Sequence, residues 1–252
     1  MKGKNPSRKM RKKRPFSRRR IVGGAHVAHV YIFYHIYCNT NTLDIVRDQV
    51  SKILFSGLYD DCTNIFCYLA GKKEQIDIVK KYIDTLPKKF LIKEVGLDDT
   101  SYERFTMDKI KHIVNDNDKF LYIHTKGVTR TYDKDQTSEN VYFWRNYMEY
   151  YLIRHYKKCL EKLDTNDIVG TLYKEFLIGP HFSGNFWWAK GSYFKKLAKH
   201  HAIGTFYMDP ESYIFKEKPK YGQADENNII ADQVSLYSTP MYPKTFMDKP
   251  IV

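Results

Sequence analysis

The stretch Phe120–Gly127, Phe-Leu-Tyr-Ile-His-Thr-Lys-Gly, decides the fold. Its first four residues are apolar without a helical period, which predicts a strand buried on both faces of a sheet. The polarity changes within one residue to His124, Thr125 and Lys126, and Gly127 then allows the chain to turn. Open, mostly parallel sheets bind ligands outside the carboxyl ends of their strands. An imidazole, a hydroxyl and an ammonium there favour an anionic ligand, and an ordinary polar turn is the alternative.

Apolar runs alternate with helical patterns before this stretch. Strands are predicted over residues 28–38, 64–70 and 90–95, with helices over 43–56, 74–86 and 101–114. This alternation predicts an α/β fold in three layers, with a mostly parallel sheet, flanking helices and right-handed crossovers.

The second half of the chain continues with less regular signals. A charged loop over residues 128–139 is predicted to form a flap beside the site, and a long helix with a wide apolar face is expected over 141–163. A strand follows over 167–172, then a helix from Ser192 to about His200, and Asp209-Pro210-Glu211 opens another helix.

The net charge of +13 is unevenly distributed along the 252 residues. Residues 1–20 hold eleven Lys and Arg and no acidic residue, so the remainder is close to neutral. We expect a disordered basic tail over 1–20 and one folded domain over 21–252. Such a tail can contact nucleic acid, acidic lipid or a nuclear import receptor.

The four cysteines lack the spacing of metal ligands, and we expect reduced thiols, as in a cytoplasmic or nuclear protein. The apolar stretch 21–37 follows the basic tail as a membrane anchor would. Gly23-Gly24 and three histidines interrupt it, and it is shorter than the ~20 apolar residues of a bilayer helix. We therefore predict no transmembrane segment.

A second informative stretch runs from His181 to Tyr193. Its small polar centre is flanked by aromatic residues, and the adjacent Trp187 and Trp188 are expected on opposite faces of a strand, one toward a pocket. Aromatic faces pack on the C–H surface of a pyranose, and nearby polar groups bind its hydroxyls. The residues predicted to contact a sugar are Ser183, Gly184, Asn185, Trp187 and Trp188. The alternative is that both tryptophans are core residues.

Together with the alternation of elements, Tyr122–Gly127, Trp144-Arg145, Asp167–Gly170 and Phe182–Trp188 resemble small GT-A (Rossmann-like) glycosyltransferases. The similar enzymes are viral and bacterial ones that build surface polysaccharide or capsid glycans, and the resemblance covers about residues 30–215. It implies a nucleotide diphosphate sugar donor, for which a uridine one is expected, and a glycan or glycoprotein acceptor. It also implies a cytoplasmic location, in the host cell if the protein is viral.

The resemblance also implies roles for individual residues. Those expected at the donor are His35, Tyr37, His124, Thr125, Lys126, Gly127 and Arg145. Asp209 or Glu211 resembles the carboxylate that deprotonates the acceptor in inverting enzymes, although an acidic first helical turn explains the same residues.

The expected metal site departs from the GT-A pattern. Most GT-A enzymes hold a divalent cation with an Asp-x-Asp pair where the fourth strand ends, and this chain has His124-Thr125-Lys126 there. Asp116-Asn117-Asp118 precedes the strand and is rejected as the metal site. Lys126 can neutralise the leaving diphosphate directly, and His124 either binds phosphate or is a single metal ligand. Mn²⁺ or Mg²⁺ should therefore matter less than in Asp-x-Asp enzymes.

Two other functional classes remain open at this stage. The basic tail and the many tyrosines are compatible with a nucleic-acid-binding protein. A sugar-binding domain without catalytic activity is the third hypothesis.

Overall fold

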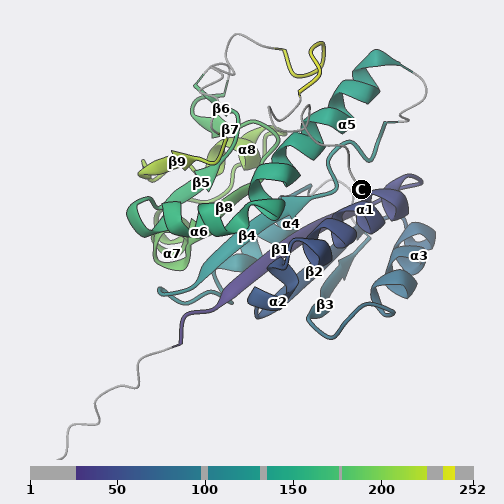
Figure 1. Cartoon of the computed structure of the whole chain (residues 1–252), viewed down its shortest axis with the longest axis horizontal. Coiled ribbons are helices and arrows are strands. Elements are labelled where there is room, and N and C mark those ends of the chain that lie inside the picture. The colour runs from purple at the N-terminus through teal and green to yellow at the C-terminus, as the bar shows by residue number, and fades with distance from the viewer. Residues whose placement is uncertain (1–26, 98–101, 131–134, 176–177, 226–234, 242–252) are drawn as a thin grey trace, which may run out of the picture.

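The computed structural model describes residues 27–97, 102–130, 135–175, 178–225 and 235–241. The predicted basic tail, residues 1–20, lies outside these ranges. In the amino-terminal half, strands alternate with helices along the chain (Figure 1). The strands are β1 (Val30–Cys38), β2 (Asn64–Gly71), β3 (Phe90–Gly96), β4 (Lys119–His124), β5 (Ile168–Gly170), β6 (Tyr173–Lys174), β7 (His181–Phe182), β8 (Trp187–Lys190) and β9 (Tyr221–Gln223).

The central sheet has seven strands in the order β3-β2-β1-β4-β8-β5-β9. The first four are mutually parallel, β8 runs antiparallel to β4 and to β5, and β9 is parallel to β5. The apolar run of β4 pairs with β1, and both strands are buried along nearly their whole length. The predicted α/β fold, a mostly parallel Rossmann-like sheet flanked by helices, is confirmed.

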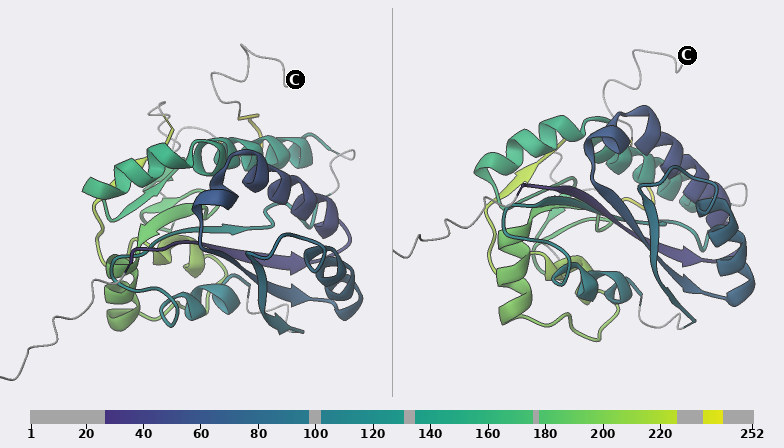
Figure 2. Two further views of the ribbon diagram at one scale, coloured as in Figure 1. Left: turned by 60° about the horizontal axis from the view of Figure 1, so that its bottom comes forward. Right: turned by 90° about the horizontal axis from the view of Figure 1, so that it is seen from below.

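Helices cover both faces of this sheet (Figure 2). They are α1 (Thr42–Phe55), α2 (Leu58–Asp61), α3 (Lys73–Ile83), α4 (Arg104–Ile110), α5 (Gln136–Glu149), the π-helical turn η1 (Tyr150–Arg154), α6 (Tyr156–Thr165), α7 (Gly191–His200) and α8 (Asp209–Tyr213). One apolar layer joins the sheet to α1, α3, α5 and α6, and a second joins it to α4, α7 and α8. The resulting molecule has three layers, as expected.

The long helix predicted over residues 141–163 differs from the prediction at two places. Helix α5 already begins at Gln136, because the Asp135 carboxylate accepts a hydrogen bond from the Ser138 amide at 2.7 Å and caps the first turn. The loop predicted over 128–139 is therefore wrong from residue 136 onward, where the chain is helical. A π-helical turn then interrupts the helix, and the Trp188 indole donates to the Leu152 carbonyl inside that turn at 2.9 Å.

The two adjacent tryptophans of β8 point to opposite faces, as their alternation predicts. Trp188 packs in the layer of α5 and α6, and Trp187 stacks on Tyr122 in the layer of α4 and α7. Both indoles are fully buried. The prediction that one of them faces a pocket is wrong, because helices cover this part of the sheet on both sides.

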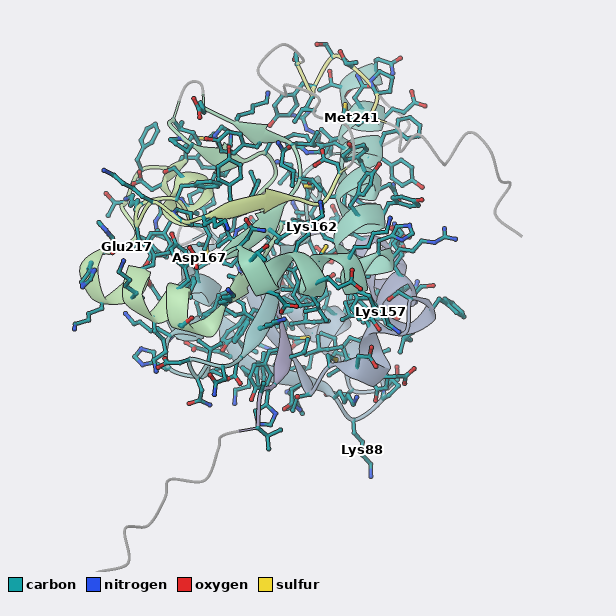
Figure 3. All side chains as sticks on the ribbon, turned by 60° about the vertical axis from the view of Figure 1, so that its left-hand side comes forward. Lys88, Lys157, Lys162, Asp167, Glu217 and Met241 are labelled. Atoms are coloured by element: carbon teal, nitrogen blue, oxygen red, sulfur yellow. The ribbon has the colours of Figure 1, made fainter. Side chains whose placement is uncertain are left out.

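The side chains of Lys162 and Asp167 hold the edge strand β9 and the residue before it (Figure 3). Lys162 of α6 donates to the Gln223 carbonyl at 2.6 Å, and the Asp167 carboxylate accepts from the Lys220 amide at 2.9 Å. These bonds fix the short strand β9 beside β5 although it has only three residues.

The predicted thiols and the rejected acidic motif are both found as expected. All four cysteines are free and buried. Asp118 lies at the amino end of β4, where its carboxylate accepts from the His29 and Asn115 amides, and Asp116 pairs with Lys195. None of the helices in the described ranges combines the length and the hydropathy needed to cross a bilayer.

Candidate functional site

A cleft of about 280 Å³ opens at the carboxyl ends of β1 and β4. It lies where the parallel strands of the sheet end, which is the position predicted from Phe120–Gly127. Of the predicted donor residues it is lined by His35, Tyr37, His124, Thr125, Lys126 and Gly127, and of the predicted catalytic residues by Glu211. The other lining residues are Tyr102, Glu103, Val128, Thr129, Arg130, Val141, Tyr207 and Tyr237.

The floor of the cleft is the pair of strand ends. His35 and His124 are register partners on β1 and β4, and the Thr125 hydroxyl accepts from the Tyr37 amide at 3.0 Å. The His35 Nδ1 atom lies 2.9 Å from the Thr106 hydroxyl of α4. Burial lowers the pKa of both histidines to about 3, and the neighbouring Lys126 ammonium adds to the effect at His124. Both imidazoles are therefore neutral near pH 7.

The tautomer of His124 follows from its two neighbours. Its Nε2 atom lies 2.9 Å from the Gly184 carbonyl oxygen and 3.1 Å from Glu103 Oε1. A carbonyl oxygen only accepts, so Nε2 carries the proton and Nδ1 is left with its lone pair. Its proton is directed to the Gly184 carbonyl, and Glu103 lies close to the same nitrogen of a neutral imidazole.

Glu103 is a site residue that the sequence prediction missed. It precedes α4, and its second oxygen accepts from the Asn185 amide at 3.2 Å. Burial raises the pKa of this carboxyl group, while Lys126 and the Asn185 hydrogen bond act in the opposite direction. A largely buried carboxylate lining a cleft is typical of a functional site.

One side of the cleft carries its cations. The Lys126 ammonium lies 4.0 Å from the centre of the Trp144 ring of α5, and the Arg130 guanidinium lies 5.4 Å from the centre of the Tyr237 ring. Trp144 and Tyr237 in turn pack edge to face at 5.6 Å. These cation–π contacts place two positive charges on the α5 side without neutralising them.

The opposite side of the cleft carries its carboxylates. Glu211 stands in the first turn of α8, and its charge is close enough to His124 to favour the imidazolium. Glu103 lines the same cleft from the start of α4, as do Tyr102 and Tyr207, whose rings meet edge to face at 5.1 Å. The carboxylates thus come from helices on one face of the sheet, and the cations contact aromatic rings on the α5 side. The Lys126 charge is still close enough to Glu103 to lower the pKa of that carboxyl group.

Arg145 does not line the cleft. This predicted donor residue is buried, and its guanidinium donates to the Lys126 carbonyl at 3.1 Å from behind. It also contacts the carboxylates of Asp48 and Glu149 at 3.5 and 3.4 Å. Its structural role is to hold the backbone of the cation-bearing segment.

Glu149 is the centre of this buried network. Its carboxylate accepts from Gln49 at 2.8 Å and from Lys52 at 2.5 Å, and the same Gln49 amide donates to the His124 carbonyl at 3.1 Å. The Tyr34 hydroxyl donates to Gln49 from the sheet. The backbone of residues 124–126 is thus held by Gln49 and Arg145, and both of these side chains contact the Glu149 carboxylate.

We expect Glu149→Gln to lower the free energy of unfolding by about 1 to 3 kcal/mol, because Arg145 and Lys52 lose a buried charged partner. Urea unfolding measures this change, and Glu139→Gln on an exposed turn of the same helix is the matched control. If Glu149→Gln were as stable as the control, the buried network around Glu149 would not stabilise the folded protein.

The residues predicted to bind the acceptor lie behind the cleft. Gly184 and Asn185 form a left-handed turn that accepts from His124 and donates to Glu103. Ser183 and Asn185 are buried, and the Asn185 oxygen accepts from the Trp187 indole at 2.7 Å. None of these residues, nor Trp187 or Trp188, lines the cleft.

Asp209 has a structural contact in place of a catalytic one. Its carboxylate accepts from the Phe206 amide at 2.7 Å, and it does not line the cleft. Of the two predicted catalytic carboxylates, only Glu211 is exposed to the cleft.

The donor set of the cleft does not fit a clamp for a hard divalent cation. In the described part of the chain, no three His, Cys, Asp or Glu side chains meet as a metal site would need. Both Glu103 oxygens are already engaged by His124 and Asn185. Asp225 is buried against Tyr147 and Leu172, and burial raises its pKa. Asp225 does not line the cleft.

Sequence signals for the missed residues are weak but recognisable. Tyr102 and Glu103 stand in the first turn of the helix predicted over 101–114, after the strand predicted over 90–95, and Tyr207 precedes the helix predicted to open at Asp209. These places are near the carboxyl edge of the sheet. Arg130 lies in the segment predicted as a flap. These four residues differ from ordinary surface residues only in that the fold brings them to one cleft.

Comparison with known proteins gives one family and a remote structural similarity. A family model described as "Domain of unknown function (DUF8361)" matches residues 33–229. Comparison with curated proteins gives no match. Among similar solved structures is 4-diphosphocytidyl-2C-methyl-D-erythritol synthase from Anaerococcus prevotii DSM 20548, which is 10% identical, with a TM-score of 0.44 over 78% of this chain and 88% of that one. We therefore argue the function from the residues of the cleft.

Proposed function

We propose that this chain, which belongs to the family described as "Domain of unknown function (DUF8361)", is a glycosyltransferase that uses a nucleotide diphosphate sugar. The observation that carries the proposal is that two cations and two carboxylates line the same cleft. Lys126 and Arg130 contact the rings of Trp144 and Tyr237, and Glu103 and Glu211 stand at the starts of α4 and α8. Sugar transfer needs both: cations for a departing diphosphate and a carboxylate for an acceptor hydroxyl.

The donor occupies the cationic side in this proposal. The diphosphate lies against Lys126 and Arg130, and the backbone turn at Gly127, with a φ of 84°, lets the chain pass close to it. The nucleoside extends toward the end of β1, where His35 and Tyr37 line the cleft. A uridine nucleotide is the donor class we favour.

The reaction moves one glycosyl group. As Glu211 takes the proton of the acceptor hydroxyl, the acceptor oxygen bonds to the anomeric carbon and the bond from that carbon to the diphosphate oxygen breaks. The electron pair of the broken bond stays on the nucleoside diphosphate, where Lys126 and Arg130 stabilise the added charge. This sequence inverts the configuration of the sugar. Asn185 holds Glu103 in place, and the neutral His124 beside it adds no charge.

The proposal predicts weak dependence on divalent cations, because ammonium and guanidinium groups stand where a metal clamp would. Lys126→Ala removes one charge-assisted contact worth ~1.5 to 3 kcal/mol, so affinity for UDP should fall roughly ten- to a hundredfold. Calorimetric titration of UDP and UDP-hexoses with Mn²⁺ or with EDTA measures this, and EDTA should leave the wild-type affinity within about threefold. Lys88→Ala, at an exposed lysine far from the cleft (Figure 3), is the control.

Two results would overturn the proposal. One is that no nucleotide diphosphate or nucleotide sugar binds to the wild-type protein. The other is that EDTA abolishes UDP binding while Lys126→Ala leaves it unchanged, which would assign the neutralisation to a metal ion.

A further inference from the structure

Three exposed aromatic residues stand on the carboxylate side of the cleft. Tyr102 is 44% exposed, Phe206 is 67% exposed and Tyr207 is 63% exposed, although large aromatic side chains usually bury most of their surface. Tyr102 and Tyr207 line the cleft, and Phe206 extends the same surface outward along the chain. We call these three residues the aromatic rim.

The aromatic rim is held by polar contacts beneath it. The Arg104 guanidinium donates to the Gly204 carbonyl at 2.5 Å and also to the Phe206 carbonyl, and the Asp209 carboxylate accepts from the Phe206 amide. A Cβ atom at Gly204 would lie 2.1 Å from an Asp209 carboxylate oxygen, so a larger residue there would displace the carboxylate that holds the Phe206 amide. The exposed rings thus project from a braced segment, which reduces the conformational entropy lost when a ligand binds.

Tyr102 has an unusual backbone conformation. Its φ is 47°, in the left-handed region that bulky residues avoid, and the residue is followed directly by Glu103. The Arg104 guanidinium lies 6.0 Å from the Tyr102 ring centre. This turn directs the tyrosine ring and the Glu103 carboxylate to the same cleft.

We propose that the aromatic rim is the acceptor subsite and that the acceptor is a pyranose-containing glycan. Aromatic faces pack against the C–H faces of a pyranose, while carboxylates accept hydrogen bonds from its hydroxyls. The rim combines exposed rings with Glu103 and Glu211, whereas the cations that suit the diphosphate lie across the cleft. This inference rests on the proposed function, because only a transferase has an acceptor. It replaces the assignment of the acceptor site to Trp187 and Trp188, which are buried.

Saturation-transfer NMR with a panel of methyl pyranosides tests the rim without requiring turnover. The wild-type protein should transfer saturation to the ring protons of at least one glycoside. Tyr207→Ala and Phe206→Ala should each weaken its binding about three- to tenfold, because each removes one aromatic face. Tyr207→Phe keeps the face and should bind as the wild type does. Phe55→Ala is the matched control, since Phe55 is 89% exposed at the end of α1, outside the cleft.

The outcomes separate this inference from the function on which it rests. Saturation transfer that is absent for every glycoside, or that survives both alanine variants, overturns the acceptor subsite. A tenfold loss of UDP affinity in Tyr207→Ala also overturns it, because the rim would then hold the nucleoside. If the wild-type protein binds glycosides at the rim but no nucleotide diphosphate, the carbohydrate site stands and the glycosyltransferase proposal fails.

Discussion

Glu211→Gln lowers kcat for sugar transfer by roughly 10²- to 10⁴-fold if Glu211 deprotonates the acceptor, which is the usual contribution of a positioned general base. The substitution keeps the size of the side chain and removes only its ability to take a proton. Affinity for UDP should change less than about threefold, because the nucleotide lies on the cationic side of the cleft. Initial rates of UDP release with a methyl pyranoside or glycan acceptor measure the first effect, and calorimetry measures the second.

Glu74→Gln is the control for this substitution, because Glu74 also stands in the first turn of a helix but is exposed, outside the cleft. Glu103→Gln separates the two carboxylates of the site. One Glu103 oxygen accepts from Asn185 and the other lies 3.1 Å from His124 Nε2, whereas Glu211 stands in the first turn of α8 at the cleft. Glu103→Gln should therefore cost less in kcat. A larger loss for Glu103→Gln, or an unchanged rate for Glu211→Gln, would contradict the role of Glu211 as the base.

The sequence was most informative where chemistry and topology depend on local patterns. A short apolar run followed at once by His124, Thr125 and Lys126 specifies a buried parallel strand and its carboxyl end. The same reasoning applies to His35 and Tyr37 on β1, because all parallel strands end at one edge of the sheet. These residues meet in the cleft because strand direction alone brings them together.

Prediction from the sequence failed where the answer depends on what covers a side chain. Trp187 and Trp188 alternate across a strand as predicted, but no local pattern tells whether a helix or a pocket covers each face. Arg145 looked like a donor contact and is instead a buried partner of Glu149, which is only four residues further along the same helix. Glu103 was missed because its partners, His124 and Asn185, are far away in the sequence.

The buried histidines His35 and His124 predict a loss of stability in mild acid. Their pKa values of about 3 in the folded state lie below the ordinary value of 6.5, so the unfolded chain binds protons first as the pH falls. The stability that they contribute is present above about pH 6.5 and is lost as the pH falls from there toward about 3. Between pH 7 and pH 5 each histidine should cost about 2 kcal/mol, or about 4 kcal/mol for the pair.

The groups around the two imidazoles act in both directions. Lys126 and the partner histidine oppose protonation, and Glu211 and the Gly184 carbonyl favour it at His124. Glu103 has a raised pKa in the folded state, so its own contribution is present at low pH and is lost as the pH rises through that value. Comparison with histidine variants is therefore needed to separate the two effects.

Urea unfolding at pH 7 and pH 5 makes this separation with the variants His35→Gln, His124→Gln and their combination. The wild-type protein should lose about 4 kcal/mol more than the double variant between the two pH values, and each single variant should lose about half of that excess. His112→Gln replaces an exposed histidine and should behave as the wild type does. An equal loss in the wild type and the double variant would mean that both imidazoles are protonated in the folded protein. His124 would then be a third cation at the diphosphate, whereas a neutral His124 leaves that charge to Lys126 and Arg130.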